Sequence, residues 1–127
     1  MQEQHLYEYA VIRVLPKVER EEFLNIGIIV FCKKAKYIKT KYQVDVTKLQ
    51  LFANEMDFET LDAYLQAFEK ITNASKDGGP IAQFDMPSRF RWLTAVRSSV
   101  LQTSRPHPGL SLDLDGTLEH LFEELVL

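Results

Sequence analysis

Apolar residues in the first third of the chain follow the alternation expected of a β-sheet. The run from residue 25 to residue 32 is apolar on both alternating faces, which predicts a strand covered on both sides. A helix is the rival interpretation, but the run is short, rich in β-branched residues and followed directly by Lys33 and Lys34. The strand pattern assigns one face to Ile26, Ile28, Val30 and Cys32 and the other to Ile29 and Phe31.

Two further strands are predicted on either side of this central run. Residues 6–15 alternate between two largely apolar faces and end at Pro16, which has no N–H to donate to a sheet. A charged connector, residues 17–24, has the composition of one helical turn. After a polar break at 33–36, residues 37–44 place lysines on one face and apolar or hydroxyl side chains on the other, which predicts a hairpin partner with one solvated face.

The remaining two thirds of the chain is predicted to be mainly helical. A short helix is expected after Asp45 or Thr47. Asp57 is a favourable N-cap for a longer helix that extends to Ile71 with apolar residues at three- and four-residue steps, Tyr64 among them. The glycine-rich segment 73–80 predicts a loop.

After that loop the pattern predicts a short helix, a short strand and a final helix. The short helix covers residues 88–94, and residues 98–104 form the candidate fourth strand. Two prolines and a glycine in residues 105–109 predict irregular structure. The last helix is expected from Asp115, with Leu118, Leu121, Phe122 and Leu125 as its apolar stripe.

Together these elements predict one α+β domain over residues 1–127. Its mostly antiparallel sheet of three to four strands is expected to be covered by two main helices, the one after Asp57 and the C-terminal one. The apolar stripe of the C-terminal helix leaves open whether it packs on its own sheet or forms a homo-oligomer.

Composition narrows the functional classes. A formal charge of −3 argues against a protein that coats nucleic acid, and no apolar run is long enough to cross a membrane. The N-terminus has no basic and apolar leader pattern. The single cysteine, Cys32, excludes an internal disulfide and fits a reducing compartment. We therefore expect a soluble cytoplasmic protein.

No established catalytic motif is present. Gly78-Gly79-Pro80 lacks the lysine and hydroxyl residue that would complete a phosphate-binding loop. The three histidines lack metal-ligand spacing, so neither a metal nor a cofactor is expected. Cys32 lies in an apolar strand, which indicates a core residue and not a reactive thiol.

Two polar segments nevertheless contain candidate site residues. Guanidinium groups, hydroxyls and an imidazole suit recognition of phosphate or carboxylate groups. The candidates are Arg20, Glu22 and Asn25 before the central strand, and Arg97, Ser104, Arg105 and His107 in the later segment.

Each of these segments also has a purely structural interpretation. Asn25 could bond a loop backbone while Gly27 makes room for a ring, and the acidic C-terminal tail could neutralise the arginines. The lysines and tyrosines of residues 33–42 could bind single-stranded nucleic acid, but a solvated hairpin protected by lysines explains them better.

Three blocks of the sequence resemble a known bacterial family. They are YEYAVIRV at 7–14, EREEFLNIGIIVFC at 19–32 and TSRPHPG at 103–109. The family they resemble is domain of unknown function 3037, and the similarity extends over nearly the whole chain. The resemblance implies no reaction. It implies a protein partner, because genes of such proteins are often found beside those of HipA-like kinases.

Two functional hypotheses follow. The first is a non-enzymatic accessory or regulatory module that binds a protein partner, with a HipA-like kinase as the implied partner. The second is an enzyme or anion-binding protein that acts on a phosphorylated small molecule or nucleic acid through the arginine and histidine residues. The sequence leaves open which of the two holds.

Overall fold

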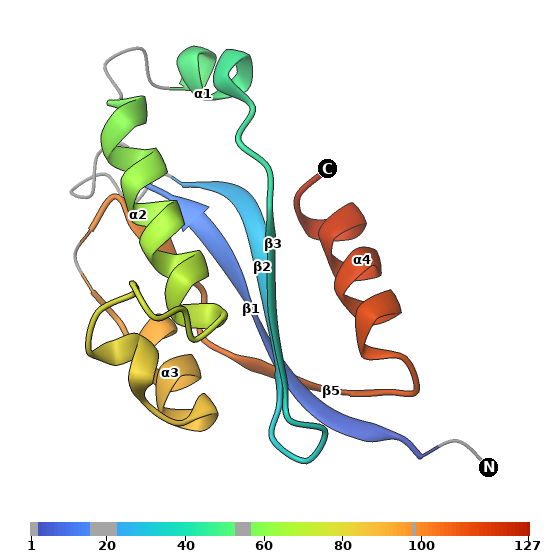
Figure 1. Ribbon diagram of the computed structural model, residues 1–127. Helices are drawn as coiled ribbons and strands as arrows, with labels where there is room; N and C mark the ends of the chain where they lie inside the picture. Colours follow the sequence, from blue (N-terminus) through green and yellow to red (C-terminus); the bar gives the residue numbers. More distant parts are fainter. Residues whose placement is uncertain (1–2, 16–22, 53–56, 98) are drawn as a thin grey trace.

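The computed structural model describes residues 3–15, 23–52, 57–97 and 99–127. Residues 17–22 of the charged connector, where a helical turn was expected, lie outside these ranges, and Leu24 is the first residue of β2. Figure 1 shows the order of the elements along the chain. They are β1 (His5–Val14), β2 (Leu24–Cys32), β3 (Tyr37–Tyr42), α1 (Val46–Phe52), α2 (Phe58–Thr72), the 3-10 helix η2 (Ile81–Gln83), α3 (Met86–Leu93), β4 (Leu101–Thr103), β5 (His107–Ser111) and α4 (Leu114–Leu125).

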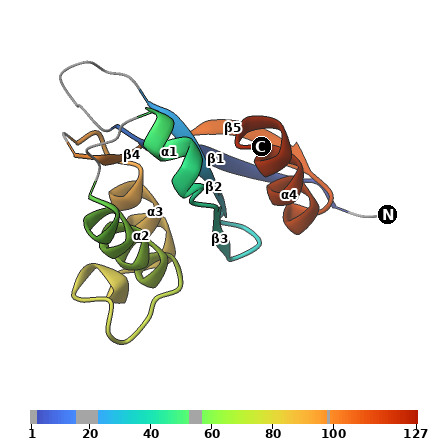
Figure 2. The same ribbon diagram turned by 90° about the horizontal axis from the view of Figure 1, so that it is seen from above.

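The strands form one antiparallel sheet with helices on both faces, so the predicted α+β class is confirmed. The order across the sheet is β3-β2-β1-β4, and β5 also pairs with β1. The described sheet therefore has five strands, more than the three to four that were predicted. Figures 1 and 2 show α2 and α3 on one side of the sheet and α4 on the other.

The fifth strand arises where irregular structure was predicted, and that prediction is wrong for residues 107–109. β4 pairs with β1 from Leu101 to Thr103, and β5 pairs with β1 again from His107 onward. β4 and β5 lie along the same edge of β1, and the pairing with β1 is interrupted only between these two strands. Pro108 is tolerated because β5 is an edge strand, where a missing N–H need not break the pairing.

Ser104 connects the chain to β1 at the interruption between β4 and β5. Its N–H donates to the Val11 carbonyl at 2.8 Å. Its hydroxyl accepts the Val11 N–H at 2.9 Å and lies 3.0 Å from the carbonyl of Arg105, to which it donates. The side chain thus replaces the backbone acceptor that a regular ladder would supply to Val11.

Ser104→Ala should therefore lower the free energy of unfolding by about 1–3 kcal/mol, because the buried Val11 N–H would lose its acceptor. Urea unfolding of the wild type and the variant measures the effect. Ser88→Ala is the matched control, since Ser88 is exposed. Equal stability of Ser104→Ala and the control would contradict this role.

A second irregularity alters the predicted faces of the central strand. Ile12 pairs with Gly27 but Arg13 pairs with Asn25, so Ile26 is the extra residue of a β-bulge. Ile26 therefore packs with Ile29, on the α2 side, and not with Ile28 as predicted. A Cβ at Gly27 would lie 2.7 Å from the Lys41 carbonyl oxygen, which explains the glycine.

The sheet separates two apolar clusters. On the α2 and α3 side, β1 and β2 residues pack against Leu61, Leu65 and Phe90. On the other side, the predicted stripe of α4 packs against Val11, Ile28, Val30 and Cys32. The stripe of α4 is thus buried on its own sheet. Helix α2 begins after the predicted cap, Asp57. Helix α4 begins at Leu114, one residue before the predicted start, with Asp113 as its N-cap and Asp115 in its first turn as expected.

Two acidic residues of α4 pair with β3 lysines. Lys39 Nζ lies 2.8 Å from a carboxylate oxygen of Asp115, and the Tyr37 hydroxyl donates to the same oxygen at 2.7 Å. Lys41 pairs with Glu119. Asp115 and Glu119 therefore neutralise lysines of the hairpin, whereas the structural interpretation of the sequence had the acidic tail neutralise arginines. Hydrogen bonds from Lys39 and Tyr37 lower the pKa of Asp115.

Because the folded pKa of Asp115 lies below its usual value of 3.8, this carboxylate stabilises the fold above that pH and loses its contribution as the pH falls through the folded pKa. We expect Asp115→Asn to flatten the loss of stability below about pH 4. Urea unfolding of both proteins across the acid range measures the difference. Parallel pH profiles would contradict a role for this contact.

Candidate functional site

The predicted site residues lie in separate parts of the structure. Arg20 and Glu22 are outside the described residues. Asn25 lies in β2 on the α4 side, where its amide nitrogen donates to the Leu125 carbonyl at 3.0 Å. Asn25 thereby ties the end of α4 to the sheet, a role close to the structural interpretation of this residue.

Ser104, Arg105 and His107 lie along the β4–β5 edge. Ser104 is buried in the interruption already described. Arg105 and His107 are exposed, and the imidazole of His107 packs against the ring of Tyr9 with centroids 5.3 Å apart. The structure therefore brings these three residues to one edge, away from the end of α4 that Asn25 contacts.

Two neighbouring arginines of the same sequence segment have structural partners. Arg89 is 6% exposed and donates from Nη1 to the carbonyls of Ile71 and Thr72 at 3.0 and 2.7 Å. Arg91 forms a bidentate pair with Glu8, at 2.9 and 2.7 Å. This hydrogen bonding raises the pKa of Arg91. Neither guanidinium has its full set of donors available for a ligand.

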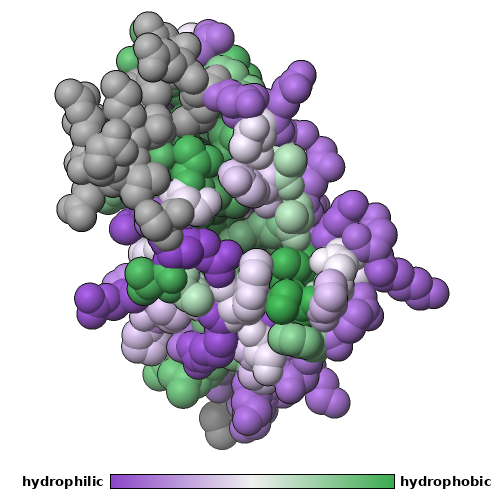
Figure 3. Space-filling view, turned by 90° about the vertical axis from the view of Figure 1, so that its left-hand side faces the viewer, coloured by the Kyte–Doolittle hydropathy of each residue, from purple (hydrophilic) through white to green (hydrophobic). Residues whose placement is uncertain are grey.

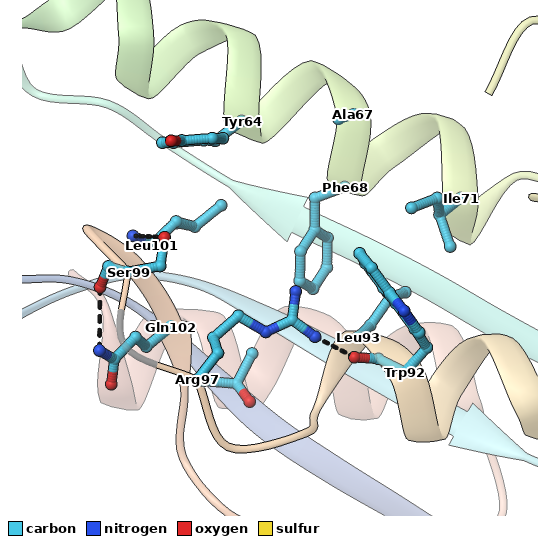
Figure 4. A pocket seen from close by; sticks show the side chains of 11 residues that line it. Tyr64, Ala67, Phe68, Ile71, Trp92, Leu93, Arg97, Ser99, Leu101 and Gln102 are labelled. Atoms are coloured by element: carbon cyan, nitrogen blue, oxygen red, sulfur yellow. Dashed lines mark hydrogen bonds between the residues drawn. The ribbon is translucent and has the colours of Figure 1, made fainter. Parts of the chain in front are cut away.

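Arg97 lies in a different environment, at a pocket between α2, α3 and β4 that we call the Trp92 pocket. Figure 4 shows Tyr64 projecting from α2 and Trp92 from α3, with the Arg97 side chain reaching toward Trp92. The pocket is lined by Tyr64, Ala67, Phe68, Ile71, Trp92, Leu93, Arg97, Ser99, Leu101, Gln102 and Thr103. Its floor is continuous with the core, since Phe68, Leu93 and Leu101 are buried there.

Aromatic and guanidinium groups form the accessible part of the Trp92 pocket. Tyr64 is 46% exposed and Trp92 is 40% exposed. The guanidinium carbon of Arg97 lies 4.4 Å from the Trp92 ring centroid, and Arg97 also donates to the Trp92 carbonyl. This geometry is that of a cation–π contact. Burial lowers the pKa of Arg97, although an arginine remains protonated at any physiological pH.

Polar groups lie on the β4 side of the pocket. Gln102 donates to the Ser99 carbonyl at 2.9 Å. The hydroxyl oxygen of Thr103 is buried and has no hydrogen-bond partner among the described residues. The described residues that line the pocket include no carboxylate, histidine, cysteine or lysine. The described pocket therefore combines apolar contact surface, one cation and a few neutral polar groups.

The size of the pocket limits what it can hold. Its volume of about 180 Å³ is below the range of about 300–1,000 Å³ typical of sites for small molecules. It can accommodate one or two side chains.

Figure 3 views the molecule from the α2 and α3 side and shows apolar areas, in green, surrounded by polar residues, in purple.

Sequence analysis missed the aromatic part of this site. Tyr64 was assigned to the buried stripe of its helix, and Trp92 was not singled out. The stripe that is buried consists of Leu61, Leu65, Phe68 and Ile71 with Thr72, and Tyr64 lies beside it. The spacing of apolar residues on the short helix could have indicated that Trp92 is exposed. Leu93 continues the buried face of that helix, and Trp92, next to it in sequence, therefore points elsewhere.

The described part of the chain lacks two specialised features. No group of three or more histidine, cysteine, aspartate or glutamate side chains there could hold a metal ion. No helix within the described ranges combines the length and apolar character needed to cross a bilayer.

The fold and the pocket define an α+β protein with a sheet between two helical layers and a small aromatic pocket at its α2–α3 face. The chain belongs to a family of proteins of unknown function, DUF3037, whose model matches residues 9–126. The suspected membership is thus confirmed. Neither a curated protein nor a solved structure matches the chain.

Proposed function

We propose that this protein is a non-enzymatic accessory or regulatory module that binds a protein partner through the Trp92 pocket. The observation that carries the proposal is the exposure of Tyr64 and Trp92, with the half-buried Arg97 beside them, over a buried apolar floor. Tyrosine, tryptophan and arginine are the residues most enriched where interfaces concentrate their binding energy.

The chemistry of the pocket supports binding more than catalysis. A general acid or base, or an activated nucleophile, requires titratable groups within hydrogen-bond reach of each other. The described lining offers only arginine, tyrosine, serine and threonine hydroxyls, without a base beside them. A volume that fits side chains also favours a protein ligand over a cofactor.

The proposed partner is the HipA-like kinase that the family resemblance implies. A cytoplasmic location is part of this proposal, since Cys32 is a free buried thiol and such a partner would be met inside the cell.

Tyr64→Ala should weaken binding to the kinase at least about tenfold, because it removes one exposed wall of the pocket. Isothermal titration of the purified kinase with each protein measures the affinity. The double variant Arg105→Ala/His107→Ala is the control and should bind like wild type. The absence of any complex at micromolar concentrations, or unchanged affinity of Tyr64→Ala, would refute binding of this partner through the pocket.

A second proposal concerns Arg105 and His107. Both side chains are exposed at one edge of the sheet, two residues apart, which favours an anion-binding role. A thermal-shift screen with nucleotides, sugar phosphates and oligonucleotides tests it. A ligand at one hundred times its dissociation constant should add about 2.7 kcal/mol of stability. Stabilisation that disappears in the double variant would support this second proposal over the first.

A further inference from the structure

The charge at the Trp92 pocket indicates what kind of segment it would hold, an inference that rests on the proposed function. Three described arginines surround this end of α3, but they differ in how their charge is compensated. Arg89 faces backbone carbonyls, and Arg91 faces the Glu8 carboxylate. Within the described residues, Arg97 has only carbonyl acceptors and the Trp92 ring as partners.

The contacts of Arg97 position its side chain without neutralising it. Its Nη2 donates to the Trp92 carbonyl, and its Nε lies 3.4 Å from the Ala95 carbonyl. The Trp92 ring supports the guanidinium from one face. A planar guanidinium held in this way has lost side-chain freedom before a ligand arrives, which lowers the entropic cost of binding a carboxylate.

The β4 side of the pocket also contains neutral polar groups. The Thr103 hydroxyl is buried and has no partner within the described ranges, although buried polar groups are normally hydrogen-bonded. Buried apolar side chains form the floor of the same pocket. A ligand that satisfies all three features needs an apolar side chain for the floor and an acidic group for the rim.

We propose that the Trp92 pocket binds a linear peptide segment of the partner in which an aromatic or large aliphatic side chain is followed or preceded closely by a carboxylate. The apolar side chain occupies the space between Tyr64 and Trp92, and the carboxylate pairs with Arg97. Such a segment matches both the small volume and the single positive charge of the lining.

Selection from a phage-displayed library of random heptapeptides tests this specificity. The library is panned in parallel on wild type, Arg97→Gln and Tyr64→Ala, each checked for folding by circular dichroism. Peptides selected on wild type should be enriched in Asp or Glu beside an aromatic or aliphatic residue. Their affinity should fall at least about tenfold on Arg97→Gln and should weaken with added salt.

Two controls separate the inference from the function on which it rests. Arg97→Lys keeps the charge but not the planar fork, so it should retain the preference for acids with reduced affinity. Peptides that bind wild type and not Tyr64→Ala, but carry no acid, would overturn the inference and leave the proposed function standing. Failure to select any peptide that depends on Tyr64 would overturn both.

Discussion

Replacing Arg89 with methionine should lower the free energy of unfolding by about 3 kcal/mol, one of the two largest effects that we expect. Arg89 donates to the Ile71 and Thr72 carbonyls at the end of α2, and its Nε donates to the Phe84 carbonyl at 3.0 Å. Helix ends leave such carbonyls without intrahelical partners. Methionine fills a similar space but removes the Arg89 donors from the Thr72 and Phe84 carbonyls, whereas the Ile71 carbonyl still accepts the Ala74 N–H at 3.3 Å.

Arg105→Met is the matched control, because Arg105 is exposed. It should change stability by less than about 0.5 kcal/mol. Urea unfolding of the three proteins measures both values. If Arg89→Met is no less stable than Arg105→Met, the arginine does not hold the end of α2, and its assignment as a structural residue is wrong.

The second large effect is expected at Phe90. Its ring is fully buried and stacks on Phe31 of β2, with centroids 4.7 Å apart. Phe90→Ala should cost about 3–5 kcal/mol, because it removes buried apolar surface and leaves a cavity between α3 and the sheet.

Phe84→Ala provides the comparison for the same chemical change, since Phe84 is 48% exposed. It should cost less than about 1 kcal/mol. Differential scanning calorimetry or urea unfolding separates the two outcomes. A similar small cost for both variants would mean that α3 does not pack on the sheet through Phe90.

Period and composition were sufficient to predict most elements of the fold. The apolar run of β2 and the stripe of α4 have clear periods, and each is buried as its period indicates. The prediction failed where a single residue changed the register. The bulge at Ile26 and the Ser104 interruption each depend on how one strand pairs with another, which alternation within a strand does not specify.

The candidate site was harder to predict, because the sequence does not reveal which arginines are already paired. Arg89, Arg91 and Arg97 are close in sequence and chemically identical. Only the fold assigns the first to carbonyls of α2, the second to Glu8 on β1 and the third to the Trp92 ring. The pocket also combines residues of α2, α3 and β4, so no local pattern contains it.

The two helical layers differ in how much of their surface is left for a partner. α4 is fixed to the sheet by its apolar stripe and by the contacts of Asp115 and Glu119 with β3. α2 and α3 cover the other face but leave Tyr64 and Trp92 accessible between them. We therefore expect partner contacts on the α2–α3 side and not on the α4 side.

Fluorine NMR of the single tryptophan tests the central proposal most directly. Since Trp92 is the only tryptophan in the chain, labelling with 5-fluorotryptophan gives one resonance, and it comes from the pocket. Unlabelled HipA-like kinase is added until the two proteins coelute on size exclusion. Binding at the pocket predicts that this resonance shifts or broadens, and that Tyr64→Ala raises the kinase concentration required. A complex that forms while the Trp92 resonance stays unchanged would contradict the account.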